Sequence, residues 1–118
     1  MRISQAFRFE AAHHLPNAGE GHRCREFHGH SYRVELRLDG PVDPITGFVA
    51  DFFAIESAFR PLLDRLDHRY LNKIEGLENP TAENIAKWIW RQMKPELALL
   101  SSVIIFETPD CWAEYDGS

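Results

Sequence analysis

The sequence predicts a single α+β domain over residues 1–118, with two helices on one face of a four-stranded antiparallel sheet. Two segments near the N-terminus alternate apolar and polar residues, which indicates strands with one buried face. Two amphipathic segments with helical spacing follow in the middle of the chain, and two strand-like segments end it. Strands at both ends, with the helices together between them, are typical of an antiparallel sheet that is covered on one side.

The first two predicted strands cover residues 3–13 and 28–39. In the first strand, His13 shares the parity of the apolar residues, so it lies at the end of the buried face. In the second strand, His28 and His30 begin the apolar set that continues along the core-facing side. A loop rich in Pro, Asn and Gly joins the two strands.

The two predicted helices follow in the middle of the chain. Asp51 can cap a helix that runs to Leu66, and Pro61 inside it predicts a kink or a restart of the helix. Thr81 is a favourable N-cap for a second helix that ends near Lys94.

The rest of the chain is expected to form one loop and two strands. Residues 70–80 are interpreted as a loop between the helices and the last part of the chain. Residues 102–108 are apolar and β-branched, and residues 111–115 follow a Pro-Asp turn, so both are predicted as strands. The open edges of such a small sheet favour a homo-oligomer.

Composition excludes several classes of partner. The net charge is -5 and no run of basic residues occurs, which argues against binding to nucleic acid. No apolar run approaches the roughly 20 residues that span a bilayer, and the N-terminus lacks the apolar core of a signal peptide. We therefore expect a cytoplasmic protein with no membrane partner, in which Cys24 and Cys111 are free thiols.

Three histidines form the candidate metal site. If the first two strands pair as a hairpin, His13 falls opposite the region of His28 and His30, and three imidazoles converge. Three protein ligands with a fourth position open are typical of a catalytic zinc (Zn²⁺) site. The alternative is that these are ordinary core histidines whose ring nitrogens are satisfied by hydrogen bonds. That explanation is common for a single buried histidine but less so for three on matching strand parity.

Cys24 lies four residues before His28, and its role stays open at this point. The thiol could be a fourth zinc ligand, which would make the site structural. It could instead be a free thiolate, favoured by nearby cations such as Arg23 and Arg25, or it could be inert.

Two further motifs carry acidic groups. Asp67 and His68 could form a base relay at the end of the first helix, or His68 could simply satisfy the last helix carbonyls. Glu107 shares the parity of the buried residues of its strand, so its carboxylate needs a donor partner. A ligand with a guanidine-like edge would supply two parallel N–H groups, whereas the alternatives are a salt bridge or a solvated strand end.

These motifs occur in the order found in the 6-pyruvoyl-tetrahydropterin synthase family, which the chain resembles over residues 9–108. The motifs are Phe9-Glu10-Ala11-Ala12-His13, Cys24 with His28-Gly29-His30-Ser31, Leu66-Asp67-His68 with Leu71-Asn72, Asn79-Pro80-Thr81 with Glu83, and Glu107-Thr108. The short gap between Cys24 and His28 resembles the branch called 6-carboxy-5,6,7,8-tetrahydropterin synthase, which belongs to queuosine (7-deazaguanine) biosynthesis.

The resemblance implies a fold, an assembly and a reaction. The fold would be the tunnelling fold, or T-fold, and two trimers would stack into a homohexamer with active sites between subunits. The substrate would be 7,8-dihydroneopterin triphosphate. The products would be 6-carboxy-5,6,7,8-tetrahydropterin, acetaldehyde and triphosphate.

The resemblance also assigns roles to single residues. The zinc ligands would be His13, His28 and His30. The metal would bind the hydroxyl groups of the substrate side chain and acidify the adjacent C–H. Cys24 would be the catalytic thiolate that acts as general base.

The same resemblance gives roles to four other residues, and one further residue, Glu26, bears on the choice of branch. Asp67 and His68 would be a partner pair that relays protons on the other side of the substrate. Glu107 would bind the amino-pyrimidine edge of the pterin, and Thr81 would contact the pterin across a subunit interface. Glu26 lies between Cys24 and His28, near where some folate-pathway relatives place a working glutamate.

Three functions therefore compete. The first is the zinc lyase just described. The second is a sister activity, either triphosphate elimination to a 6-pyruvoyl product or side-chain cleavage to a 6-hydroxymethyl pterin. The third is a binding module with a structural zinc that is held by three histidines and Cys24.

Overall fold

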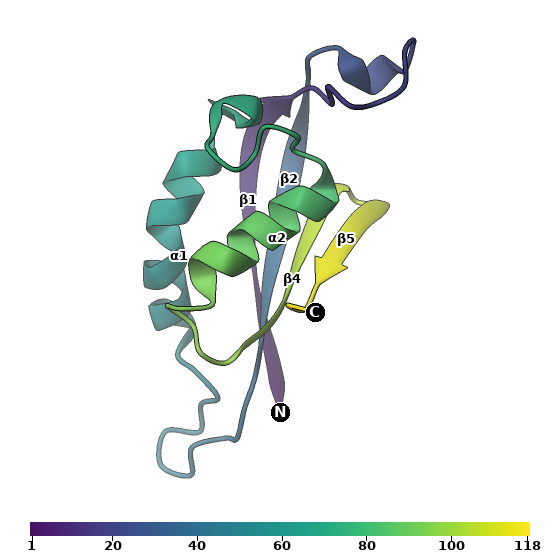
Figure 1. Cartoon of the computed structure of the whole chain (residues 1–118). Coiled ribbons are helices and arrows are strands. Elements are labelled where there is room, and N and C mark those ends of the chain that lie inside the picture. The colour runs from purple at the N-terminus through teal and green to yellow at the C-terminus, as the bar shows by residue number, and fades with distance from the viewer.

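A computed structural model describes residues 1–118 and shows a sheet of five strands that carries two helices on one face (Figure 1). The strand order across the sheet is β3-β1-β2-β4-β5. In chain order the elements are β1 (Arg2–His13), η1 (Arg23–Arg25), β2 (His28–Asp39), α1 (Phe52–Leu66), β3 (Arg69–Tyr70), η2 (Leu71–Lys73), α2 (Ala82–Met93), β4 (Leu100–Thr108) and β5 (Cys111–Tyr115).

The long antiparallel pair β1 and β2 is the centre of the sheet. The alternation of both segments predicted these strands, and the pairing register places Ala11 opposite His30 and His13 opposite His28. The loop of residues 14–27 joins them and carries η1 beyond one end of the sheet (Figure 1). The hairpin expected from the sequence is therefore confirmed.

The prediction of a four-stranded antiparallel sheet is wrong in one respect. Arg69 and Tyr70 form a fifth strand, β3, that runs parallel to β1 at the edge of the sheet, so the sheet is mixed. This segment falls within and just before the predicted loop of residues 70–80. A strand of two residues is too short to show a period of two, which is why the sequence pattern did not reveal it.

The two helices were predicted closely. Asp51 caps α1 by accepting a hydrogen bond from the backbone of Phe53, and the helix continues through Pro61 as one element. Thr81 caps α2 by accepting a hydrogen bond from the backbone of Asn84 at 3.1 Å. Helix α2 ends at Met93, one residue before the expected end.

The core lies between the sheet and the two helices. Each strand contributes alternate residues, and each helix contributes one apolar stripe. The fully buried large side chains are Phe9, Tyr32, Leu36, Leu38, Ile55, Phe59, Leu66, Leu71, Leu77, Ile85, Ile89 and Leu100. Neither helix has the length and apolar character that crossing a membrane requires.

Candidate metal centre and active site

Three imidazoles converge where β1 ends and β2 begins. The ligand atoms of His13, His28 and His30 all lie within 4.8 Å of one another. His13 and His28 are opposite each other in the strand pairing, and the Nε2 atoms of the two rings are 3.0 Å apart. The structure therefore brings together the three residues that the sequence proposes as metal ligands.

The hydrogen bonds of two rings show which nitrogen atoms are available. The Nδ1 of His13 lies 2.8 Å from the carbonyl oxygen of Pro80, and the Nδ1 of His28 lies 2.8 Å from that of Glu26. A carbonyl oxygen only accepts, so each Nδ1 carries the hydrogen and donates it. In the neutral imidazoles both Nε2 atoms then present lone pairs to the same point. Lone pairs 3.0 Å apart repel unless a proton or a metal ion lies between them.

Burial favours a metal ion at this point. His13 is completely buried. Burial is also the main cause that lowers the pKa of His13 to about 4, against the opposing effect of its hydrogen bond to Pro80. Burial likewise lowers the pKa of His30, although the nearby Glu107 carboxylate acts in the other direction. Neutral imidazoles whose Nδ1–H is held by a backbone carbonyl are the usual ligands of protein-bound transition metals, so the residues fit a divalent ion.

Tyr32 supports the His13 ring from within the core. Its hydroxyl oxygen lies 3.1 Å from the Nδ1 of His13, and the side chain is completely buried. Burial raises the pKa of the Tyr32 phenol, so the group stays protonated at neutral pH. The hydroxyl and the Pro80 carbonyl together hold the orientation of the His13 ring.

Glu107 extends from β4 toward the histidine cluster. Its Oε2 lies 3.5 Å from the Nε2 of His13 and 3.6 Å from the Nε2 of His30, and the side chain is half-buried. Burial does not single out the predicted parity, because Ile104 is buried as well as Val103 and Ile105; the contacts with the histidines are what place the Glu107 side chain. The carboxylate thus lies beside the candidate metal position.

Cys24 lies in η1, on the loop that connects the two histidine-bearing strands. The thiol is free and half-buried, and the residue lines a cavity of about 330 Å³ together with His28 and His30. Its sulfur is not among the atoms that lie within 4.8 Å of one another in the cluster. His22 holds the turn in place, since its Nδ1 accepts a hydrogen bond from the backbone N–H of Cys24 at 3.0 Å.

Asp67 and His68 form a pair just before β3, where they bind the backbone of β1 at Glu10. The Asp67 carboxylate accepts a hydrogen bond from the backbone N–H of Glu10 at 2.9 Å, and the backbone N–H of His68 donates to the Glu10 carbonyl oxygen. The His68 Nδ1 lies 3.1 Å from Asp67. The Glu10 N–H is the main cause that lowers the pKa of Asp67, and His68 adds to it.

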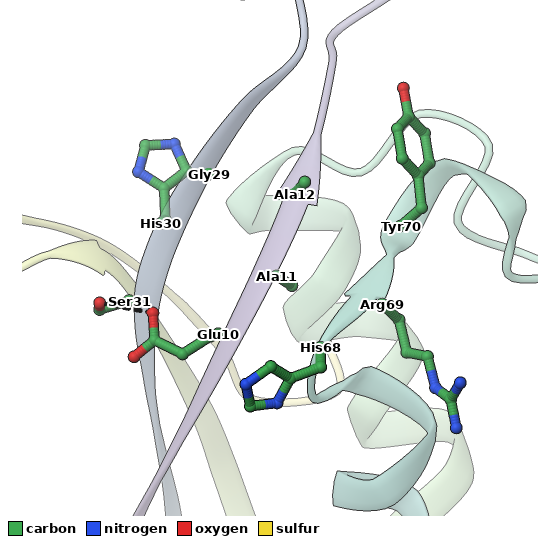
Figure 2. Close-up of a pocket in the computed structure, with 9 residues that line it drawn as sticks. All are labelled: Glu10, Ala11, Ala12, Gly29, His30, Ser31, His68, Arg69 and Tyr70. Carbon is green, nitrogen blue, oxygen red and sulfur yellow. Dashed lines mark hydrogen bonds between the residues drawn. The ribbon is translucent and has the colours of Figure 1, made fainter.

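The pair opens onto the sheet face that the helices leave uncovered. The His68 backbone is left-handed, with φ at 57°, and its side chain is 79% exposed. His68 lines a cavity of about 550 Å³ with Glu10 and Ser31 (Figure 2). Figure 2 shows the Glu10–Ser31 hydrogen bond beside the His68 ring, whereas the ring of His30 points away from them. His30 of the cluster lines the same cavity, but no hydrogen bond or ion pair joins Asp67 or His68 to the three histidines.

Thr81 has a structural role in the single chain. Its hydroxyl oxygen accepts the capping hydrogen bond of α2, which leaves its own O–H free to donate. The preceding residue, Pro80, supplies the carbonyl that binds His13. The start of α2 is thus tied to the metal site through the main chain.

Several residues that shape the site were missed from the sequence. Pro80 acts through a main-chain atom, which leaves no side-chain signal. Tyr32 could have been found, because it continues the parity of His28 and His30. Asn72 binds both backbone groups of His14: its Oδ1 accepts from the N–H and its Nδ2 donates to the carbonyl, each at 2.9 Å.

Comparisons with known proteins agree with this geometry. The family model described as 6-pyruvoyl tetrahydropterin synthase matches residues 2–118. A 6-carboxy-5,6,7,8-tetrahydropterin synthase of Synechocystis sp. is 40% identical over 119 residues, which cover 96% of this chain and 91% of that protein. A dihydroneopterin monophosphate aldolase of Pyrococcus furiosus is 36% identical over 96 residues, or 81% of this chain and 77% of that protein.

A solved structure agrees as well. The structure of Caenorhabditis elegans 6-pyruvoyl tetrahydropterin synthase matches with a TM-score of 0.92 and 30% identity, and covers 100% of this chain and 96% of that chain. The likeness over the whole length supports the T-fold that the sequence predicts. The chain therefore belongs to the 6-pyruvoyl tetrahydropterin synthase family.

Proposed function

We propose that this pterin-processing lyase converts 7,8-dihydroneopterin triphosphate and water to 6-carboxy-5,6,7,8-tetrahydropterin, acetaldehyde and triphosphate, in queuosine (7-deazaguanine) biosynthesis. The observation that carries the proposal is the pair of Nε2 atoms of His13 and His28, held 3.0 Å apart with both Nδ1 atoms bound to carbonyls. The Synechocystis relative, which carries this activity in its name, supports the choice of product.

The cofactor in this proposal is zinc (Zn²⁺), held by His13, His28 and His30. Neutral nitrogen ligands at three positions, with a fourth position left for substrate, suit a catalytic zinc ion. When bound, the ion supplies Lewis-acid polarisation of an oxygen on the substrate side chain. The buried Tyr32 and the Pro80 carbonyl hold the His13 ring in the orientation that this role requires.

Cys24 is the proposed general base. It lines the same cavity as His28 and His30 while its sulfur stays outside the ligand cluster, which suits a group that removes a proton from a substrate rather than one that binds the ion. Glu107 is the proposed site for the amino-pyrimidine edge of the pterin. A carboxylate can accept two parallel N–H groups from such an edge.

Asp67, His68 and Thr81 complete the proposed site from a neighbouring subunit. No contact joins the pair to the histidines of its own chain, while the His68 side chain is 79% exposed and free to reach another chain. The proposal therefore includes a homohexamer of two trimers in which each site is shared. Asp67 orients the His68 ring, whose Nδ1 lies 3.1 Å from the carboxylate, so that the imidazole can relay protons.

The product assay tests the proposal directly. Zinc-loaded protein is incubated with 7,8-dihydroneopterin triphosphate, and acetaldehyde and 6-carboxy-5,6,7,8-tetrahydropterin are measured by trapping and chromatography. Both products should form in equal amounts. A pyruvoyl or hydroxymethyl pterin without acetaldehyde would overturn the assignment while leaving the family membership intact.

A sister activity is the second candidate, and the residue that favours it is Glu26. This carboxylate lines the cavity of Cys24, His28 and His30, so it could act as base in place of the thiol. The names of the Caenorhabditis and Pyrococcus relatives show that other proteins of similar sequence carry related activities. Comparing the products and rates of Glu26→Gln and Cys24→Ala decides which group works.

A further inference from the structure

The two arginines that flank Cys24 differ in what their side chains contact. Arg25 donates a hydrogen bond from Nη1 to the carbonyl oxygen of Ala18 at 2.9 Å, which ties the loop together. The guanidinium of Arg23 makes no side-chain hydrogen bond or ion pair within the chain. Arg23 also lines the cavity that contains Cys24 and His28, whereas Arg25 does not. One cation of the turn is therefore free to bind a ligand.

The place of the cavity indicates which part of a substrate reaches Arg23. Glu107 lies against the histidine cluster but does not line this cavity. Glu107 and the cavity of Arg23 therefore adjoin the cluster at different places. A substrate with its pterin edge at Glu107 and its side chain at the cluster continues toward the cavity with its far end. That far end is the triphosphate. A planar guanidinium with five N–H donors matches phosphate oxygens in charge and in geometry.

We propose that Arg23 binds the triphosphate tail and so selects the phosphorylated pterin over the free one. This inference rests on the proposed function, because it takes the orientation of the substrate from it. Phe27, which is 63% exposed, forms a further wall of the same cavity. The acidic Glu26 lines the cavity too, and the positive charge of Arg23 offsets the charge of its carboxylate toward an anion.

A binding experiment tests this without turnover. Neopterin and neopterin triphosphate are fluorescent, fully oxidised pterins that serve as non-reacting probes. Zinc-loaded wild-type protein should bind neopterin triphosphate more tightly than neopterin. Arg23→Gln should weaken binding of the triphosphate about tenfold or more, the effect of losing a charge-assisted hydrogen bond, and change neopterin binding less than twofold. Arg23→Lys should recover part of the loss.

Two matched variants separate a contact from a general change of charge. Arg25→Gln removes the same charge two residues away, and Arg60→Gln removes it from the exposed surface of α1, where Arg60 pairs with Glu56. Both should keep the preference for the triphosphate probe. An equal loss in Arg25→Gln, or no loss in Arg23→Gln, overturns the role of Arg23.

Further readouts separate the inference from effects on the thiol and from the proposed function. The rate of Cys24 alkylation against pH, measured in a Cys111→Ser background, should be similar with Arg23 and with Gln at this position. A changed profile together with unchanged triphosphate binding would assign Arg23 to the thiol instead. If wild-type protein binds neither probe, both the inference and the proposed function fail; if it binds both equally, only the inference fails.

Discussion

The Nε2 atoms of His13 and His28 lie 3.0 Å apart, at the last pair of the β1–β2 ladder, and each ring is held by a carbonyl on its other nitrogen. When both imidazoles are neutral, neither Nε2 carries a hydrogen. The two atoms can then bind one cation between them but cannot hydrogen-bond to each other. The arrangement is built mainly by main-chain features, the strand register and the two carbonyls, and the hydroxyl of Tyr32 adds to it at His13. The fold therefore already directs the three candidate ligands toward one point.

Metal binding should depend on His28. We expect wild-type protein to bind one zinc ion per chain, and His28→Ala to lower the affinity by more than the 10–100-fold loss that follows removal of a residue that only orients a ligand. Competition against a chromophoric chelator measures both affinities. His14→Ala is the control, because His14 faces Tyr70 and Phe27 rather than the cluster. Equal affinity in His28→Ala and wild type would contradict the assigned ligand set.

Replacing Cys24 should separate catalysis from metal binding. We expect Cys24→Ala to keep its zinc and its fold, and to lose turnover by about 10²–10⁴-fold, the usual contribution of a positioned general base. Zinc content and product formation are measured on the same sample. Cys111→Ser should keep full activity, since Cys111 is exposed and belongs neither to the histidine cluster nor to the cavity of Cys24. Loss of zinc in Cys24→Ala would instead support a structural site.

Two inactive variants should restore each other if sites are shared between subunits. We expect Cys24→Ala and His68→Ala each to be inactive, and an equal mixture that is unfolded and reassembled to recover about one quarter of the wild-type rate, because random pairing rebuilds a quarter of the interfaces. Mixing the folded proteins without reassembly is the control and should recover little. No recovery after reassembly would show that Asp67 and His68 serve their own chain.

Asn72 should contribute strongly to stability for a single polar side chain. Its amide satisfies both backbone groups of His14, so Asn72→Ala leaves two main-chain groups unpaired and should cost about 1–3 kcal/mol. Asn72→Asp keeps only the acceptor and should lie between. Urea denaturation of metal-free protein measures the free energy of unfolding. Gln92→Ala, an exposed change on α2, should stay within about 0.5 kcal/mol of wild type.

The stability of the metal-free protein should fall in mild acid because of His13. Its pKa is about 4 in the folded chain and near the ordinary 6.5 in the unfolded chain, so the unfolded chain binds the proton first. Stability is therefore unaffected above pH 6.5 and declines as the pH falls toward 4, by up to about 3 kcal/mol. Denaturation with urea at several pH values measures this. In His13→Gln the decline should be smaller by that amount; an unchanged decline would place its cause in other groups.

The sequence predicted most of what side-chain parity can decide. Alternation alone placed His13, His28 and His30 on one face, because neighbours two apart on a strand share a side. It also placed Glu107 with the buried residues of β4. Parity carries no information on turns, so it did not show that Asp67 and His68 are held against the backbone of Glu10.

Two other features lay beyond sequence reasoning for different reasons. Strand β3 pairs with β1 over Arg69 and Tyr70 only, and its place follows from the contacts of the preceding turn with Glu10 rather than from its own residues. The carbonyl oxygens of Pro80 and Glu26, which hold the two imidazoles, belong to the main chain. Any residue type could supply such an acceptor, so no residue pattern marks it.

The last pair of the β1–β2 ladder, His13 and His28, bears on which insertions into the loop between them the protein can tolerate. His13 and His28 are fixed by their strands, so both ends of the loop of residues 14–27 are held in place. Lengthening it near Gly19 would cost little, since closure entropy grows only with the logarithm of length. The carbonyl oxygen of Cys24 accepts a hydrogen bond from the backbone N–H of Leu15 at 2.7 Å, so the thiol is placed from both sides of the loop. Insertions near Gly19 should be tolerated, whereas one added residue between Cys24 and His28 would displace the thiol from the cavity that it shares with His28.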